Sequence, residues 1–166
     1  MLVYGTDEFV ARWVGDHIPH SFNGFDPCVA IGYANTAGKL IAGFVFSGYH
    51  KECGIIGLTV AAISPQWARR EVIHEILSYP FEQLGCYKVF TATPADNEKA
   101  LKVNNHIGFK REAVLAHQFG KKRHAVIMRL LLPDYLRLFG ERHVKEHPDT
   151  PYPGDNQPAD ICVGAG

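Results

Sequence analysis

The sequence predicts an α/β domain, of the α+β type, built on a mixed, mostly antiparallel sheet with helices on both faces. Apolar residues alternate between strand-like and helix-like spacing, and turn residues separate the segments at short intervals. Three short strands follow one another early in the chain, which favours an antiparallel meander. Two later strands are separated by a helix, and such a crossover requires the two strands to be parallel.

The first half of the chain is predicted to form one helix and three strands. Residues 7–17 are expected to be helical, with Thr6 as the N-cap and Pro19 just beyond the end. Turn residues lie at positions 35–38 and 50–52. The strands between them are predicted over residues 28–34, 40–49 and 54–63.

The second half is predicted to alternate helices with strands. A helix begins near Pro65 and is expected to kink or break at Pro80. Another begins after Asp96 or Asn97 and ends at Gly108, because glycine commonly terminates helices. The remaining strands are predicted over residues 86–93, 109–115 and 125–132.

The composition is that of one globular domain with a C-terminal extension. The chain has 166 residues, of which 46% are hydrophobic and 20% charged. The domain is expected to cover residues 1–132. The extension, 133–166, is expected to form a short polar helix over 134–147 and an irregular tail over 148–166. We expect a partner to hold that tail, such as a second copy of the chain in a homo-oligomer.

Charge and hydropathy disfavour several classes of protein. A net charge of zero argues against a strong non-specific grip on nucleic acid, although basic residues gather between 110 and 129. No apolar run reaches the roughly 18 residues of a membrane span, and no signal peptide is recognised, so a cytoplasmic protein with reduced cysteines is expected. His143 and His147 lie four residues apart without a third ligand, so no metal site is predicted.

Two segments resemble the GNAT family of N-acetyltransferases. Asn97 opens a predicted helix, the small residue Ala100 follows three positions later, and Gly108-Phe109 closes the helix. This segment is similar to the family's second signature, and residues 79–92 resemble its link between the cofactor helix and the next strand. The resemblance covers residues 28–132. The stretch around Trp67 is similar to short members of the family from phages and prophages.

The resemblance implies acetyl-CoA (CoA) as co-substrate, and a fold in which two central parallel strands are splayed apart near residues 60 and 90. The pantetheine arm would lie in the resulting cleft as an added strand does, beside Leu58 and Val60. The following helix would direct its N-terminus at the pyrophosphate. Asn97 and Ala100 would contact the cofactor from the other side of the cleft.

The segment that corresponds to the family's pyrophosphate loop departs from its pattern. The family places glycines there, whereas residues 64–70 contain none. Trp67 either covers the adenine or packs into the core, and Ala68 follows it. Arg69 and Arg70 are expected to contact the phosphates through their charge. The alternative interpretation is that both arginines form a solvated helix start.

The expected catalytic residues also differ from the family pattern. Many members have a tyrosine general acid four residues before the closing glycine, where this chain has Asn104. Many have a glutamate base on the strand beside the cleft, but residues 54–60 contain no carboxylate. The nearest candidate bases are His50 and Glu52. We favour His50, because histidine takes up a proton most readily near neutral pH.

These observations predict an acyl-CoA-dependent N-acyltransferase that moves an acetyl group from acetyl-CoA to an amine. The acceptor would be a small molecule or a protein, and nucleic acid is a less favoured partner. Two alternatives remain open. One is a catalytically inactive GNAT-like fold that serves as a phage-associated structural or binding module. The other is a DNA-base-modifying enzyme on the same fold.

Overall fold

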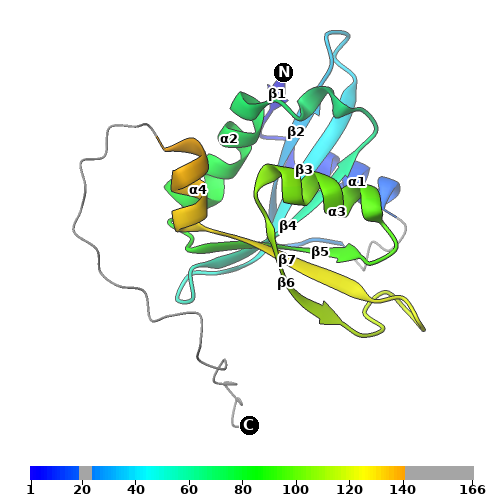
Figure 1. The fold of residues 1–166 in the computed structure, drawn as a ribbon. Coiled ribbons are helices and arrows are strands. Elements are labelled where there is room, and N and C mark those ends of the chain that lie inside the picture. The colour runs from blue at the N-terminus through cyan, green and yellow to red at the C-terminus, as the bar shows by residue number, and fades with distance from the viewer. Residues whose placement is uncertain (19–23, 141–166) are drawn as a thin grey trace, which may run out of the picture.

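A computed structural model describes residues 1–18 and 24–140, which form one seven-stranded sheet with helices on both faces (Figure 1). The strand order is β1-β2-β3-β4-β5-β7-β6. The strands are β1 (Leu2–Val3), β2 (Cys28–Ala34), β3 (Leu40–His50), β4 (Ile55–Ala62), β5 (Lys88–Pro94), β6 (Lys110–Leu115) and β7 (Ala125–Leu131). The helices are α1 (Asp7–His17), α2 (Arg70–Ser78), α3 (Glu98–Ile107) and α4 (Leu132–Phe139).

The irregular tail predicted over 148–166 and the histidine pair at 143 and 147 lie outside the described residues. The predicted short helix near residue 134 begins earlier, at Leu132, and packs on the core through the buried Tyr135. Burial and a hydrogen bond to Glu82 raise the pKa of the Tyr135 hydroxyl. Across the parts of the chain that the structure describes, no helix combines the length and the apolar character needed to cross a bilayer.

The sheet confirms the predicted meander and the predicted crossover. Strands β2, β3 and β4 pair antiparallel, whereas β4 and β5 pair parallel. The parallel pairing covers three positions and ends at Gly57↔Phe90. Strand β4 then continues to Ala62, and β5 continues to Pro94, without pairing to each other. The two central strands therefore part where the sequence led us to expect it. Strand β1 was not predicted.

The helix expected from Pro65 is divided into three parts. Pro65–Trp67 forms a 3-10 turn (η1), α2 begins only at Arg70, and Tyr79–Gln83 forms a π-helical turn (η2). Pro80 explains the last change. Its ring and its missing N–H are incompatible with an α-helical turn, so the helix widens there instead of breaking.

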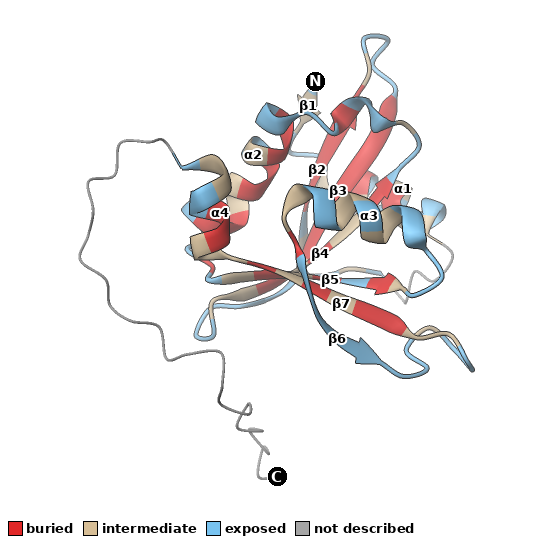
Figure 2. Cartoon of the chain, viewed as in Figure 1, coloured by how far each residue is buried: buried red, intermediate tan, exposed pale blue. Residues whose placement is uncertain are grey.

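Two hydrophobic cores lie on opposite faces of the sheet. Helix α1 covers one face with Val10 and Val14, which pack against Ala30, Val45 and Ala61. Helices α2 and α4 cover the other face, and the apolar flank of α3 packs against this larger core. Figure 2 shows the buried residues concentrated in the strands that these helices enclose.

Two glycines let α1 approach the sheet closely. Gly32 and Gly43 are register partners on β2 and β3. A Cβ atom on Gly43 would lie 2.5 Å from Cγ2 of Val14, and one on Gly32 would lie 3.2 Å from Cγ2 of Val10. At its start, α1 is held by the Asp7 carboxylate, which accepts a hydrogen bond from the Ala30 amide at 2.6 Å.

The predicted side-chain cap on α1 is not formed. Thr6 occupies the N-cap position, but its hydroxyl makes no capping hydrogen bond. Only its carbonyl oxygen takes part in the helix, by accepting from the amide of Val10 at 2.9 Å. The Asp7 carboxylate is instead bonded to β2, so the start of the helix is fixed by a tertiary contact rather than a local one.

The close packing of α1 predicts a specific non-additivity. Gly43→Ala should lower the free energy of unfolding by about 1–3 kcal/mol, because the new methyl group overlaps Val14. In a Val14→Ala background the same substitution should cost less, because space has been made. Urea unfolding of the two single variants and the double variant measures this coupling, which we expect to be about 0.5–3 kcal/mol. Strictly additive losses would contradict the packing described.

Candidate functional site

A cavity of about 470 Å³ opens where β4 and β5 part. Its walls come from the second halves of these two strands, the link from β4 to α2, the inner side of α3, the end of α1 and the loop between β6 and β7. The strands that form it stay firmly paired on their outer edges. Val60 of β4 pairs with Phe44 of β3, and Thr93 of β5 pairs with Val126 of β7. The gap between β4 and β5 therefore forms without loss of the pairing of either strand to its outer neighbour.

The inner edge of β4 offers unpaired backbone to this cavity. Leu58 and Val60 line it, and both lie beyond the last pairing to β5. Along a strand, the N–H and C=O groups of alternate residues point to the same edge. An extended ligand with amide groups can hydrogen-bond to such an edge as an added strand does.

A buried polar cluster lies on the β5 side of the cavity. The Nδ2 group of Asn104 donates to Oγ1 of Thr91 at 3.3 Å and to Oγ1 of Thr93 at 3.2 Å. Both threonines are 6% exposed, and all three residues line the cavity. Each hydroxyl accepts from the amide and so keeps its own proton for donation. A carboxamide and two hydroxyl groups thus lie where the resemblance would place a tyrosine.

The start of α3 combines a helix cap with a place in the cavity wall. The Oδ1 atom of Asn97 accepts from the amide of Ala100 at 3.1 Å, which is N-cap geometry. Both residues also line the cavity, as the resemblance implied. Asn97 therefore caps α3 and also lies within reach of a ligand in the cavity.

Of the four residues in the link between β4 and α2 that were expected to contact the cofactor, two line the cavity and two do not. Trp67 is buried and packs edge-to-face on Phe44, with ring centroids 5.0 Å apart, so it belongs to the core while lining the cavity. Ala68 also lines the cavity. Arg69 and Arg70 do not.

Both arginines are held by contacts within the fold. Arg69 donates to the Tyr33 hydroxyl at 2.8 Å. Arg70 donates to the carbonyl oxygen of Leu138 and lies over the ring of Phe139. They nevertheless flank the N-terminus of α2, where Arg69 is the N-cap residue and Arg70 the first helical residue.

The structure does not bring His50 and Glu52 to the cavity. His50 ends β3 and Glu52 lies in the turn that follows, before β4 begins. Strand β4 is paired with β5 at this end and leaves it only at the other, so the turn and the cavity lie at opposite ends of the strand. The Nδ1 atom of His50 accepts from the amide of Cys53 at 3.4 Å.

His17, which sequence analysis placed in the first helix without a role, lines the cavity. Its ring stacks on Trp13 with centroids 3.9 Å apart, and its Nδ1 lies 2.7 Å from the Trp13 carbonyl oxygen. A carbonyl oxygen only accepts, so Nδ1 carries the proton of this hydrogen bond. In the neutral ring, Nε2 is therefore the basic nitrogen.

The loop between β6 and β7 belongs to the basic stretch noted in the sequence, and it also reaches the cavity. Arg123 and Phe119 line the cavity from this loop. The guanidinium of Arg123 binds both carboxylate oxygens of Asp96, at 3.0 and 3.3 Å. The basic residues of this stretch are visible in the sequence, but only the fold brings the loop to the cavity.

The Asn104 cluster predicts a measurable difference between two neighbouring asparagines. Asn104→Ala should lower the free energy of unfolding by about 1–2 kcal/mol, because it removes two hydrogen bonds to buried hydroxyl groups. Asn105→Ala is the matched control, since Asn105 lies on the same helix and is exposed. Its loss should stay below about 0.5 kcal/mol in chemical denaturation. Equal losses would show that the cluster contributes nothing specific.

Comparison with solved structures shows the fold. Mutant forms of the spermidine/spermine N-acetyltransferase SpeG from Vibrio cholerae align with a TM-score of 0.68 at 15% identity, covering 82% of this chain and 97% of that one. The same enzyme in complex with manganese ions gives a TM-score of 0.66 at 15% identity, with 82% and 95% covered. Its dodecameric structure in an intermediate state gives 0.65 at 17% identity, with the same coverage.

These neighbours are GNAT enzymes, so the GNAT fold expected from the sequence resemblance is confirmed. No protein-family model matches the chain, and no curated protein sequence does. At 15–17% identity the likeness establishes the fold, and it leaves the chemistry of the site to be argued from this chain's own residues.

Proposed function

We propose that this protein is an acyl-CoA-dependent N-acyltransferase that moves an acetyl group from acetyl-CoA to an amine. The observation that carries the proposal is the parting of β4 from β5 beside a cavity with unpaired strand backbone on one wall. Fold likeness to N-acetyltransferases supports it. The residues around the cavity supply a group for each step of the transfer.

Acetyl-CoA fits the groups that surround the cavity. Its pantetheine arm is extended and carries amide groups, which suit the free edge of β4 at Leu58 and Val60. Its pyrophosphate suits the N-terminus of α2, where backbone N–H groups and the helix dipole favour anions. Arg69 and Arg70 add positive charge at that terminus. These charges take the place of close glycine backbone contacts.

The transfer requires a neutral amine, an activated carbonyl group and a stabilised leaving group. The lone pair of the neutral amine attacks the thioester carbonyl carbon, and the nitrogen loses one proton to the base as the new carbon–nitrogen bond forms. The carbon–sulfur bond then breaks, the electron pair leaves on sulfur as the CoA thiolate, and the amide remains. A backbone N–H on the free edge of β4 is suited to polarise the carbonyl oxygen. Holding both reactants in one cavity contributes much of the acceleration.

His17 is our proposed general base. It lines the cavity, its ring is fixed by stacking on Trp13, and the hydrogen bond to the Trp13 carbonyl leaves Nε2 as the proton acceptor. His50 and Glu52, the bases favoured by the sequence, do not line the cavity. The amine proton would therefore pass to Nε2 of His17.

The Asn104 cluster is suited to the leaving group. The hydroxyl protons of Thr91 and Thr93 are free to donate because Asn104 occupies the oxygen atoms as acceptors. A thiolate is the conjugate base of a weakly acidic thiol, with a pKa of about 8.5 for the cysteine side chain in model peptides, so hydrogen bonds from the two hydroxyl groups would stabilise it as it leaves. In this proposal Asn104 acts by positioning the two hydroxyl groups.

The proposed phosphate contact predicts different effects on two ligands. Arg69→Met should weaken acetyl-CoA binding about tenfold, the size expected for one hydrogen bond to a charged group. Binding of S-acetylpantetheine, which lacks the pyrophosphate, should be unchanged. Calorimetry measures both, with Arg12→Ala on α1 as the control. If wild-type protein fails to bind acetyl-CoA at millimolar concentration, the proposal is wrong and a GNAT-like binding module becomes the better interpretation.

The proposed base predicts a loss that is confined to one histidine. His17→Ala should lower kcat/KM for amine acetylation about 10²–10⁴-fold, the usual contribution of a general base. Acetyl-CoA affinity should be retained. His50→Ala and Glu52→Gln serve as controls and should keep near wild-type rates. Loss of activity in these controls, with His17→Ala unaffected, would return the base to the β3–β4 turn.

A further inference from the structure

The charges of the side chains around the cavity indicate which acceptor amines it can bind. Two side chains that line it are cationic, Lys99 and Arg123, and His17 is a third basic residue on its wall. Within residues 1–18 and 24–140, no aspartate or glutamate lines the cavity. The remaining walls are mainly apolar, with Phe44, Ile63 and Trp67 among them.

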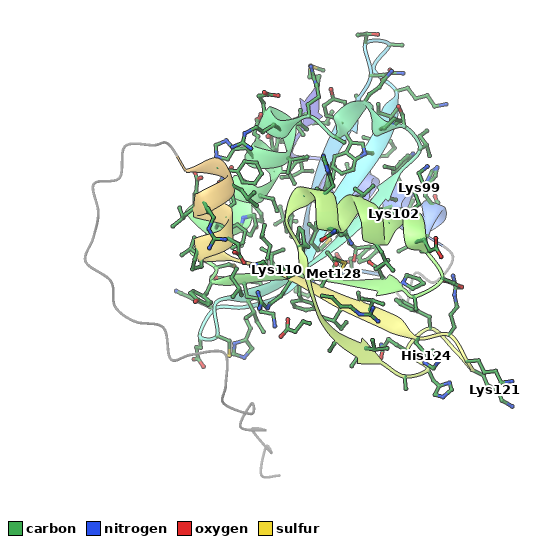
Figure 3. The ribbon with its side chains drawn as sticks, viewed as in Figure 1. Lys99, Lys102, Lys110, Lys121, His124 and Met128 are labelled. Atoms are coloured by element: carbon green, nitrogen blue, oxygen red, sulfur yellow. The ribbon has the colours of Figure 1, made fainter. Side chains whose placement is uncertain are left out.

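Lys99 carries a charge that the fold does not neutralise. It is the second residue of α3 and is exposed, and it forms no ion pair with any residue that the structure describes. Figure 3 shows it on α3 beside Lys102. The N-terminus of a helix is itself partly positive, so the charge of Lys99 adds to that of the helix dipole.

The ion pair between Arg123 and Asp96 adds no acidic side chain to the cavity wall. Arg123 lines the cavity and Asp96 does not, and both carboxylate oxygens of Asp96 bind the Arg123 guanidinium. A cationic acceptor would have to displace that pair to obtain a counter-charge. Among the residues that the structure describes, the side chains that line the cavity therefore carry no negative charge.

We infer that the acceptor is an amine carried on a largely apolar body that is neutral or anionic, and that the cavity disfavours polyamines. The inference rests on the proposed function and specifies its substrate class. A polyamine has several cationic nitrogens, and only the reacting one becomes neutral. The others would lie among like charges without a carboxylate to replace their hydration. An apolar body instead matches the walls, and a carboxylate or phosphate on it is attracted by Lys99.

This substrate class differs from that of the enzymes with a similar fold. Those structures are of spermidine N-acetyltransferases, and spermidine is a polyamine. Identity of 15–17% leaves room for a different acceptor site on the same sheet.

The test compares three amines and two lysine variants. Phenethylamine, phenylalanine and spermidine are each incubated with acetyl-CoA and the full chain, and acetylated product is measured by mass spectrometry. The better of the first two should show a kcat/KM at least tenfold above that of spermidine. Lys99→Glu should reverse the preference, with about a tenfold gain for spermidine and a similar loss for phenylalanine. Lys102→Glu, three residues along α3, is the matched control and should change neither.

Calorimetry with acetyl-CoA separates failure of the inference from failure of the proposed function. If acetyl-CoA binds and spermidine is the preferred acceptor, the inference is overturned and the acyltransferase proposal stands. The same holds if Lys99→Glu weakens acetyl-CoA binding and leaves the acceptor preference unchanged, because the charge then serves the co-substrate. If acetyl-CoA binds and no amine of the panel is acetylated, the predicted substrate class is wrong. If acetyl-CoA does not bind, both proposals fail.

Discussion

The structure depends on one incomplete strand pairing. Strands β4 and β5 share three paired positions and then separate, while β3 and β7 hold their outer edges in register. Backbone N–H and C=O groups that leave a ladder need other partners, since burying them unpaired is costly. Water can satisfy them at an open cavity, and so can an extended amide ligand. The site is thus a break in the hydrogen-bonding pattern of an otherwise continuous sheet.

Because of the same break, residues from the two faces of the sheet line one cavity. Helix α1 covers one face and α3 lies over the other, so a closed sheet would keep His17 apart from Asn104. Both residues line the same cavity, at the gap between β4 and β5. The close packing of α1 on Gly32 and Gly43 therefore matters beyond stability. It fixes the position of the helix whose last residue, His17, reaches the cavity.

Fold and acceptor are decided by different parts of the molecule. The overall fold agrees with that of N-acetyltransferases of low sequence identity. The charges at the cavity come from a few positions on α1, α3 and the β6–β7 loop. Such positions can change without disturbing the sheet, because they lie outside both hydrophobic cores. A shared fold is for this reason a weak guide to the acceptor.

Local patterns in the sequence determined most of the secondary structure and part of the site. Strand and helix limits follow from turn residues and apolar spacing, and Gly108 closes α3 as expected. Leu58, Val60, Asn97 and Ala100, which the family resemblance marked for contact with the cofactor, line the cavity, and that contact stays a prediction. Tertiary structure alone decided the rest. It buried Trp67, turned Arg69 and Arg70 to partners within the fold, and left His50 at the paired end of β4. It also brought His17 and Arg123 to the cavity, since contacts between elements distant in sequence depend on packing across the sheet and leave no local periodicity to read.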